Sequence, residues 1–331
     1  MNKILLLALT LASPLAFAAQ PAAAPGAEFA VPHRLVDIGG RKLNLFCSGT
    51  GSPTVVFESP SGGAGWEWWA VQTKVAARTR ACVYDRAGFG FSDPSPRPAD
   101  AENAVDDLHA LLQAAGVAPP YVLVGNSFGG AAAELFTWRH PAEVSGLVLV
   151  EPMHEDENLR ADAVSHGKIS EFEAQIIAFG DGCAAQAEKG FEPKSQMFED
   201  CVDGADPALP KDVGEVDLQK RLTTPYWHAR RSERHTLALD RAQLRAARKP
   251  FGELPVIVLA RSISPYLIPG QPQSDANKAG EAANLALLVE VARSSTTGEV
   301  RVIPDAGHMI QQTRPDAVVR AVDELLARIR H

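Results

Sequence analysis

The segment YVLVGNSFGG, residues 121–130, places a serine between two glycines immediately after an apolar run. The run has the composition of a buried strand, and the residues after Ser127 follow a helical pattern to Arg139. Gly125 and Gly129 permit a tight turn, because neither carries a Cβ that would obstruct the backbone. The segment therefore predicts a strained strand-to-helix turn that raises the Ser127 hydroxyl above a sheet, and the helix N-terminus beneath it favours developing negative charge.

Strand and helix patterns alternate on both sides of this turn. Apolar runs bounded by Gly and Pro predict eight strands, at residues 34–39, 41–49, 54–58, 80–85, 121–125, 146–151, 255–260 and 299–303. The Gly39-Gly40 turn between the first two is typical of an antiparallel hairpin. Helical patterns occupy residues 66–77, 99–115, 127–139, 277–293 and 315–330. This alternation predicts an α/β fold with a mostly parallel eight-stranded sheet wrapped by helices.

Residues 152–250 interrupt the alternation. They contain no convincing core strand, and helical stretches at 170–179 and 233–248 alternate with charged loops. The simplest interpretation is a helical cap inserted after strand six, between two core segments at 34–151 and 251–331.

Composition limits the classes of partner. Hydrophobic residues make up 46% of the 331 residues, and 32 basic and 40 acidic residues give a formal charge of −8. An acidic chain is a poor match for nucleic acid or an anionic membrane surface, so a small neutral or cationic ligand fits better.

The first residues predict export. An apolar run from Ile4 to Leu11 follows Lys3, and residues 16–18 read Ala-Phe-Ala, which is typical of a cleavage site. We therefore expect a signal peptide at 1–18, a loose Pro/Ala linker at 19–33, and a periplasmic or secreted protein; an uncleaved anchor is the alternative. No later segment is long and apolar enough to cross a bilayer, so no stable span is expected after processing.

Export also bears on the four cysteines, because an oxidising compartment lets thiols pair. Cys47, Cys82, Cys183 and Cys201 could form two disulfides. Metal binding by these residues is disfavoured, because no two are close in sequence and no histidine lies beside them at ligand spacing.

A serine nucleophile requires a base, and His308 is the candidate. Of nine histidines, it is the one that follows the last predicted strand, in a loop before the final helix. Of the others, two lie on or at the end of predicted surface helices, His109 and His140. Four more lie in the insertion, where they could at most contact substrate: His154, His166, His228 and His235.

Together the segments VVFESPSGGAG, YDRAGFGFSD, VLVGNSFGG, LVLVEPMHED and AGHMIQQTRP resemble the α/β-hydrolase superfamily. The resemblance covers about residues 34–330 except the insertion. It implies the strand order 1-2-4-3-5-6-7-8, a helical cap after strand six, and a nucleophile, acid and histidine in that order along the chain. If strands two and four are neighbours, Cys47 and Cys82 could bridge them, and Cys183 and Cys201 could close a loop within the cap.

The resemblance also implies where the oxyanion hole and the acid lie. One oxyanion donor would be the N–H of Phe128; the other would be that of Ser61, with Gly62 as the alternative, since Pro60 has no N–H. Many relatives carry the acid after strand seven, but no carboxylate occurs there before Asp275. Some carry it at the end of strand six, where Glu151 stands, and Asp156 is a further alternative.

Two other motifs have mainly structural interpretations. The tryptophans at positions 66, 68 and 69 are expected to fill core volume rather than to line a pocket. In YDRAGFGFSD, the side chains of Asp85, Arg86 and Ser92 are expected to pair within a scaffold turn.

The predicted function is hydrolysis of a carboxylic ester or related acyl substrate through Ser127, His308 and Glu151, without a metal or organic cofactor. The same residues could cleave an amide, as in an aminopeptidase, or a lactone. Dehalogenase and epoxide hydrolase chemistry on this fold normally uses an Asp nucleophile, and Ser127 argues against both. The remaining alternative is a non-catalytic binding protein that retains the scaffold.

Overall fold

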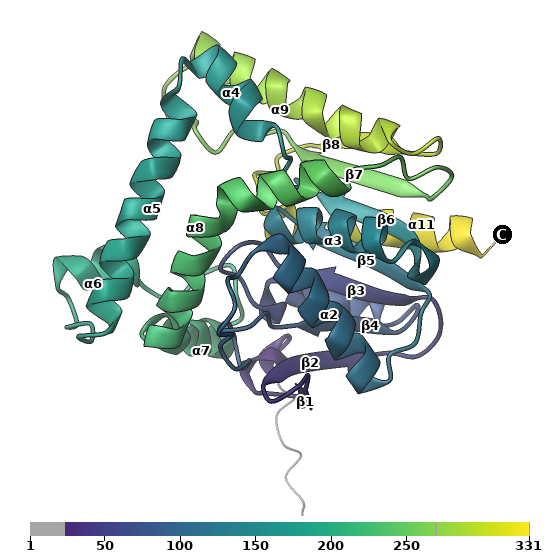
Figure 1. Cartoon of the computed structure of the whole chain (residues 1–331), viewed down its shortest axis with the longest axis horizontal. Helices are drawn as coiled ribbons and strands as arrows, with labels where there is room; N and C mark the ends of the chain where they lie inside the picture. The colour runs from purple at the N-terminus through teal and green to yellow at the C-terminus, as the bar shows by residue number, and fades with distance from the viewer. Residues whose placement is uncertain (1–23, 269, 331) are drawn as a thin grey trace, which may run out of the picture.

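The computed structural model describes residues 24–268 and 270–330, and its centre is one eight-stranded sheet (Figure 1). The strand order is β1-β2-β4-β3-β5-β6-β7-β8, which confirms the predicted order and fold class. β2 pairs antiparallel with β1 and β4, and the strands from β4 across to β8 run parallel. The strands are β1 (Arg34–Asp37), β2 (Lys42–Ser48), β3 (Thr54–Glu58), β4 (Ala81–Tyr84), β5 (Tyr121–Asn126), β6 (Val144–Val150), β7 (Val256–Arg261) and β8 (Glu299–Ile303).

Helices cover both faces of the sheet because the central strands are apolar on both sides. Consecutive strand residues point to opposite faces of the sheet, so Val122 and Leu123 belong to two separate buried clusters. One cluster packs under α2 (Ala101–Ala115), α3 (Phe128–Arg139) and α9 (Asp275–Arg293), and the other under η2 (Gly65–Trp68), α1 (Trp69–Val75) and α11 (Pro315–Ile329). The predicted core helices therefore match the observed ones to within a few residues.

The segment between β6 and β7 is helical. It contains α4 (Glu157–Ser165), α5 (Lys168–Ala187), α6 (Gln196–Cys201), α7 (Lys211–Arg221) and α8 (Thr224–Ala247). Figure 1 shows α5 and α8 side by side, and the two helices pack against each other. A small apolar cluster that includes Cys183 and Trp227 lies within this segment. The division of the chain into a cap at 152–250 and a two-part core stays a prediction.

Both predicted disulfides are present. Cys47 and Cys82 are directly opposed on β2 and β4, with an S–S distance of 2.10 Å. Cys183 of α5 and Cys201 of α6 are joined at 2.03 Å. The second bridge fastens α6 to the long helix α5.

The predicted linker at 19–33 stays a prediction, and the structure describes it from residue 24 onward. Residues Ala27–Ala30 form a short 3-10 helix, η1, and Phe29 is buried with its ring edge-on to Phe46, 5.2 Å between centroids. The aromatic ring of Phe29 packs against the core, a contact that the Pro/Ala-rich composition of this stretch did not predict. The predicted signal peptide at 1–18 lies outside the described residues. None of the described helices has the length and apolarity to cross a membrane.

Candidate active site

Ser127 lies at the turn between β5 and α3. Its backbone φ is 55°, in the left-handed region that residues other than glycine rarely adopt. The Ser127 N–H donates a hydrogen bond to the carbonyl of Val150 on the adjacent strand (3.1 Å). A Cβ at Gly125 would lie 2.2 Å from the carbonyl oxygen of Gly129, and a Cβ at Gly129 would lie 2.4 Å from that of Glu58. The turn therefore requires both glycines of the sequence pattern.

Glu151 occupies the equivalent position after β6, the strand beside β5. Its φ is 46°, also left-handed, and its N–H donates to the carbonyl of Leu259 on β7 (2.9 Å). Two residues later, the N–H of Met153 donates to the carbonyl of Ser127 (2.9 Å). Two strained residues thus lie at the carboxyl ends of neighbouring parallel strands, the edge at which α/β folds build their sites.

His308 lies in the loop between β8 and α10 (Ile310–Thr313), with Nδ1 3.6 Å from Oε2 of Glu151. The side-chain amide of Asn126 donates to the His308 carbonyl (3.2 Å), and Asn126 Oδ1 accepts from Nε2 of Gln311 (3.1 Å). These bonds tie the histidine loop to the turn that carries Ser127. In the described part of the chain the Ser127 hydroxyl makes no hydrogen bond. Because Nδ1 faces Glu151, Nε2 is the ring nitrogen that this carboxylate does not engage.

Arg261, at the end of β7, holds the other side of Glu151. Its N–H donates to Oε1 of Glu151 (2.7 Å), and its guanidinium pairs with Oε2 and with the carboxylate of Glu281. Burial acts to raise the pKa of Glu151, but the His308 imidazole and the Arg261 cation outweigh it and hold the pKa below its usual value. Glu151 is therefore a buried, ionised carboxylate beside Nδ1 of the histidine.

The two rival carboxylates lie elsewhere. Asp156 accepts a hydrogen bond from Arg245 (2.6 Å), and Asp275 is fully exposed at the start of α9. Among the described residues, neither makes a contact with His308. Of the three candidate acids, Glu151 is the one that the fold brings to the histidine.

The loop after β3 supplies the second predicted oxyanion donor. Phe128 begins α3, and the first N–H groups of a helix have no partner within the helix. Because Gly129 packs on the end of β3, the loop starts beside the nucleophile turn. The N–H of Gly62 donates to the Glu233 carboxylate (2.7 Å), whereas that of Ser61 has no partner in the described part of the chain. The hydrogen bonding favours Ser61 over Gly62 as the donor.

A cavity of about 320 Å³ lies between α2, α8 and the loop after β4. Apolar side chains such as Phe89 and Phe128 line it together with the paired charges of Arg86 and Glu233. Ser127 does not line this cavity but Phe128 does, so the cavity lies beside the turn that carries Ser127. The three tryptophans of the 66–69 segment do not line it either; Trp66 and Trp68 are buried in the core, as expected.

Two carboxyl groups, those of Glu134 and Glu58, are buried, and neighbouring positive charges do not fully offset the cost of burying their charged forms. Burial raises the pKa of Glu134 on α3 to about 8 and that of Glu58 to about 7, against the opposing charges of Arg248 and Arg86 respectively. Between the ordinary pKa and these values the folded protein holds protons that the unfolded chain has released. The free energy of unfolding therefore falls as pH rises through this window.

Glu134→Gln is expected to stabilise the protein at alkaline pH, because the amide removes a buried charge without changing the volume. A shift of this size corresponds to about 4–5 kcal/mol at 1.36 kcal/mol per pKa unit, and structural relaxation reduces it, so we expect a gain of about 1–3 kcal/mol at pH 8.5. Urea unfolding at pH 5 and pH 8.5 measures it. An equal effect at both pH values would contradict the titration, and Glu143→Gln, a more exposed carboxyl beyond the C-terminus of α3, is the control.

His109, His140 and Glu143 form a second polar cluster, with ligand atoms within 4.8 Å of one another. The imidazole rings are stacked at 3.9 Å between centroids, 18° from parallel, and His109 Nε2 lies 3.0 Å from Glu143 Oε1. Nitrogens of parallel-stacked rings do not converge on one point, which is a poor geometry for a shared metal ion. The cluster lies at the end of α3 opposite Ser127.

The sequence did not predict the partners of Arg86 and Glu151. Arg86 was expected to pair within its own loop, but it pairs with Glu233 on α8 instead, whereas Asp85 accepts the N–H groups of Gly65 and Phe91 as a scaffold. The partner of Glu151, Arg261, directly follows the apolar strand VIVLA. A charged residue at the carboxyl end of a parallel strand is a signal that could have found it.

Comparison with known proteins agrees with this fold. The sequence profile of the α/β-hydrolase family matches residues 45–321, and the chain belongs to that family. Over 123 residues it is 37% identical to 2-hydroxymuconate semialdehyde hydrolase of Pseudomonas sp. (strain CF600), a match that covers 35% of this chain and 42% of the relative. The chain spans less than half the length of the curated relatives it matches first.

Solved structures share the fold. A thermophilic esterase from Thermogutta terrifontis aligns with a TM-score of 0.56 and 22% identity, over 90% of this chain and 98% of the esterase. The haloalkane dehalogenase DbeA from Bradyrhizobium elkani USDA94 aligns with a TM-score of 0.65 and 19% identity, over 90% and 97% of the two chains.

Proposed function

We propose that the protein is a serine hydrolase that cleaves a carboxylic ester or a related acyl compound. The observation that carries the proposal is the convergence of three segments at the carboxyl edge of the sheet. The strained Ser127, the loop of His308 and the carboxylate of Glu151 are linked by the bonds from Asn126 and by the 3.6 Å contact between Glu151 and Nδ1.

The proposed reaction has two steps. Ser127 Oγ attacks the carbonyl carbon while Nε2 of His308 takes its proton, and the N–H groups of Phe128 and Ser61 stabilise the oxyanion. The C–O bond of the ester then breaks, His308 returns the proton to the leaving alcohol, and an acyl-enzyme remains. Water repeats the sequence, with His308 as base again, and releases the acid. Glu151 stabilises the imidazolium in both steps, and no metal or cofactor takes part.

The scissile bond is tested with a panel of substrates. We expect p-nitrophenyl esters to be cleaved faster than aminoacyl anilides or lactones, and labelling by a fluorophosphonate probe to map to Ser127. Faster cleavage of an anilide or a lactone would assign the same residues to an amidase or a lactonase. Absence of both labelling and turnover would instead support a binding protein that retained the scaffold. The serine at the nucleophile position favours acyl transfer over the dehalogenation named for one structural neighbour.

We also propose that the protein is exported and acts on a small molecule. The predicted signal peptide and the two disulfides support export, because disulfides persist in oxidising compartments.

A further inference from the structure

A buried ion pair connects helix α8 to Arg86 in the loop after β4, and both partners also bond to the loop after β3. Nη2 of Arg86 lies 2.9 Å from Oε1 of Glu233, and the two side chains are 7% and 2% exposed. The proposed reaction uses neither group. A buried pair of this kind is costly to form, so its surroundings indicate what it holds in place.

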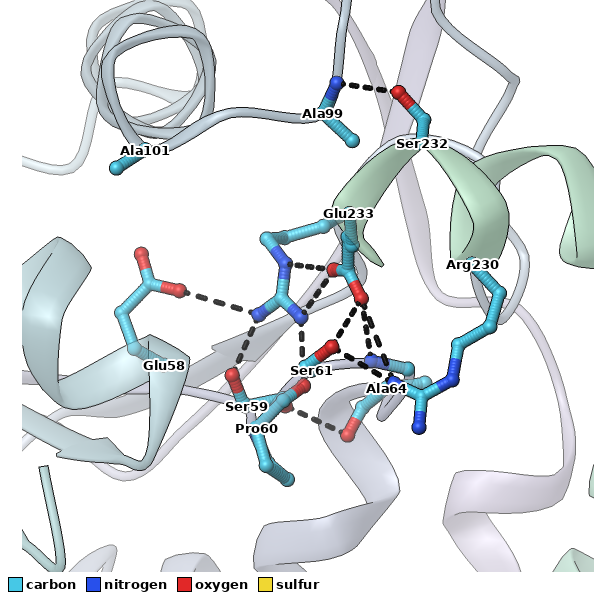
Figure 2. A network of polar contacts seen from close by, with 12 residues as sticks. Glu58, Ser59, Pro60, Ser61, Ala64, Ala99, Ala101, Arg230, Ser232 and Glu233 are labelled. Atoms are coloured by element: carbon cyan, nitrogen blue, oxygen red, sulfur yellow. Dashed lines mark hydrogen bonds and ion pairs between the residues drawn. The ribbon is translucent and has the colours of Figure 1, made fainter. Parts of the chain in front are cut away.

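The pair holds the loop at Ser59–Gly62 from two sides. Arg86 donates to the carbonyls of Ser59 and Pro60, at 2.6 Å each. The other oxygen of Glu233, Oε2, accepts from the Ser61 hydroxyl and from the Gly62 N–H, at 2.7 Å each. Figure 2 shows Glu233, carried by α8, facing Ser61 of the loop.

These bonds leave one donor unused. Pro60 has no N–H, Gly62 donates to Glu233, and the Gly63 N–H donates to the Pro60 carbonyl (3.0 Å). The Ser61 hydroxyl donates to Glu233 and accepts from Nη1 of Arg230 (2.8 Å). Within the described residues, the N–H of Ser61 is therefore the donor of residues 60–63 that stays free.

We propose that Glu233 is a positioning residue that sets the oxyanion hole. By binding the Ser61 hydroxyl and the Gly62 N–H, its carboxylate selects the Ser61 N–H as the donor and fixes its place relative to Ser127. Because Glu233 belongs to α8, the helical segment and the oxyanion loop form one mechanical unit. The inference rests on the proposed serine hydrolase mechanism.

Loss of the Glu233 bonds should affect kcat more than KM. An oxyanion donor acts mainly in the transition state, and its contribution depends on a position defined to a few tenths of an ångström. Loosening the loop should therefore lower kcat and leave KM nearly unchanged. A role confined to packing of α8 would change thermal stability, or KM, without this selective loss.

The test is the Glu233→Gln variant with p-nitrophenyl acetate as substrate. The amide keeps the shape but loses the charge that binds Arg86 and one of the two acceptor sites, so we expect kcat to fall about 10- to 100-fold with KM within about threefold of wild type. Affinity for a trifluoromethyl ketone, whose adduct places an oxyanion in the hole, should fall in parallel. Glu233→Asp should regain part of the loss.

Glu188→Gln is the matched control, because Glu188 pairs with His228 of α8 at 3.0 Å and is exposed. It should keep wild-type kinetics. The proposal is overturned if folded Glu233→Gln keeps kcat within twofold of wild type, or if KM alone changes. If that variant does not fold, Ser61→Ala decides: it keeps the N–H and removes a bond to Glu233, and an unchanged kcat would overturn the proposal. Full activity of Ser127→Ala would instead reject the hydrolase mechanism itself.

Discussion

Replacing Ser127 by alanine is expected to lower kcat for a p-nitrophenyl ester by about 10⁴- to 10⁶-fold. The hydroxyl is the atom that becomes covalently bound, and no neighbouring group takes its place on the turn. The fold should survive, because the bonds that hold this turn come from the backbone N–H and carbonyl of residue 127, which alanine retains. Alanine must still adopt a φ near 55°, which costs about 1 kcal/mol relative to a relaxed conformation.

The measurement combines steady-state hydrolysis with labelling by a fluorophosphonate. Ser145→Ala is a suitable control, because Ser145 lies near the start of β6 and its hydroxyl donates to the carbonyl of Tyr121 (3.0 Å). It should retain both labelling and turnover. Labelling of a different serine in the Ser127→Ala variant would mean that the nucleophile lies elsewhere on the chain.

The fold was largely predictable because its signals are local. Apolar runs bounded by Gly and Pro predicted every strand. Gly125 and Gly129 marked a contact with the neighbouring backbone that no side chain could occupy. The position of His308 after the last strand was equally informative. In each of these cases the constraint acts between residues close in sequence, or follows from the strand order.

The partners of the site were less predictable because they depend on packing between distant segments. Glu233 lies in a helix that carries charged residues on several sides. The helical periodicity of the sequence does not predict which of them faces Arg86. Likewise, the choice of Glu151 over Asp275 depends on how far α9 carries its first residue from the sheet. Only the packed structure shows Asp275 fully exposed and Glu151 beside the imidazole.

Glu151→Gln is expected to lower kcat by about 10³- to 10⁴-fold, with a small change in KM. In the proposed mechanism the carboxylate, 3.6 Å from Nδ1 in this structure, accepts the Nδ1 proton of His308, which leaves Nε2 unprotonated and able to act as the base. An amide in its place presents a donor or an uncharged acceptor, so the required tautomer is less favoured and the imidazolium loses its counter-charge.

Two controls separate this role from the structural pairing of Glu151 with Arg261. Glu281→Gln removes the other partner of that arginine and should leave kcat within a few-fold of wild type, because Glu281 does not contact His308 in the described part of the chain. Asp275→Asn should have no effect. If Asp275→Asn instead abolished activity while Glu151→Gln remained active, the acid would come from the start of α9.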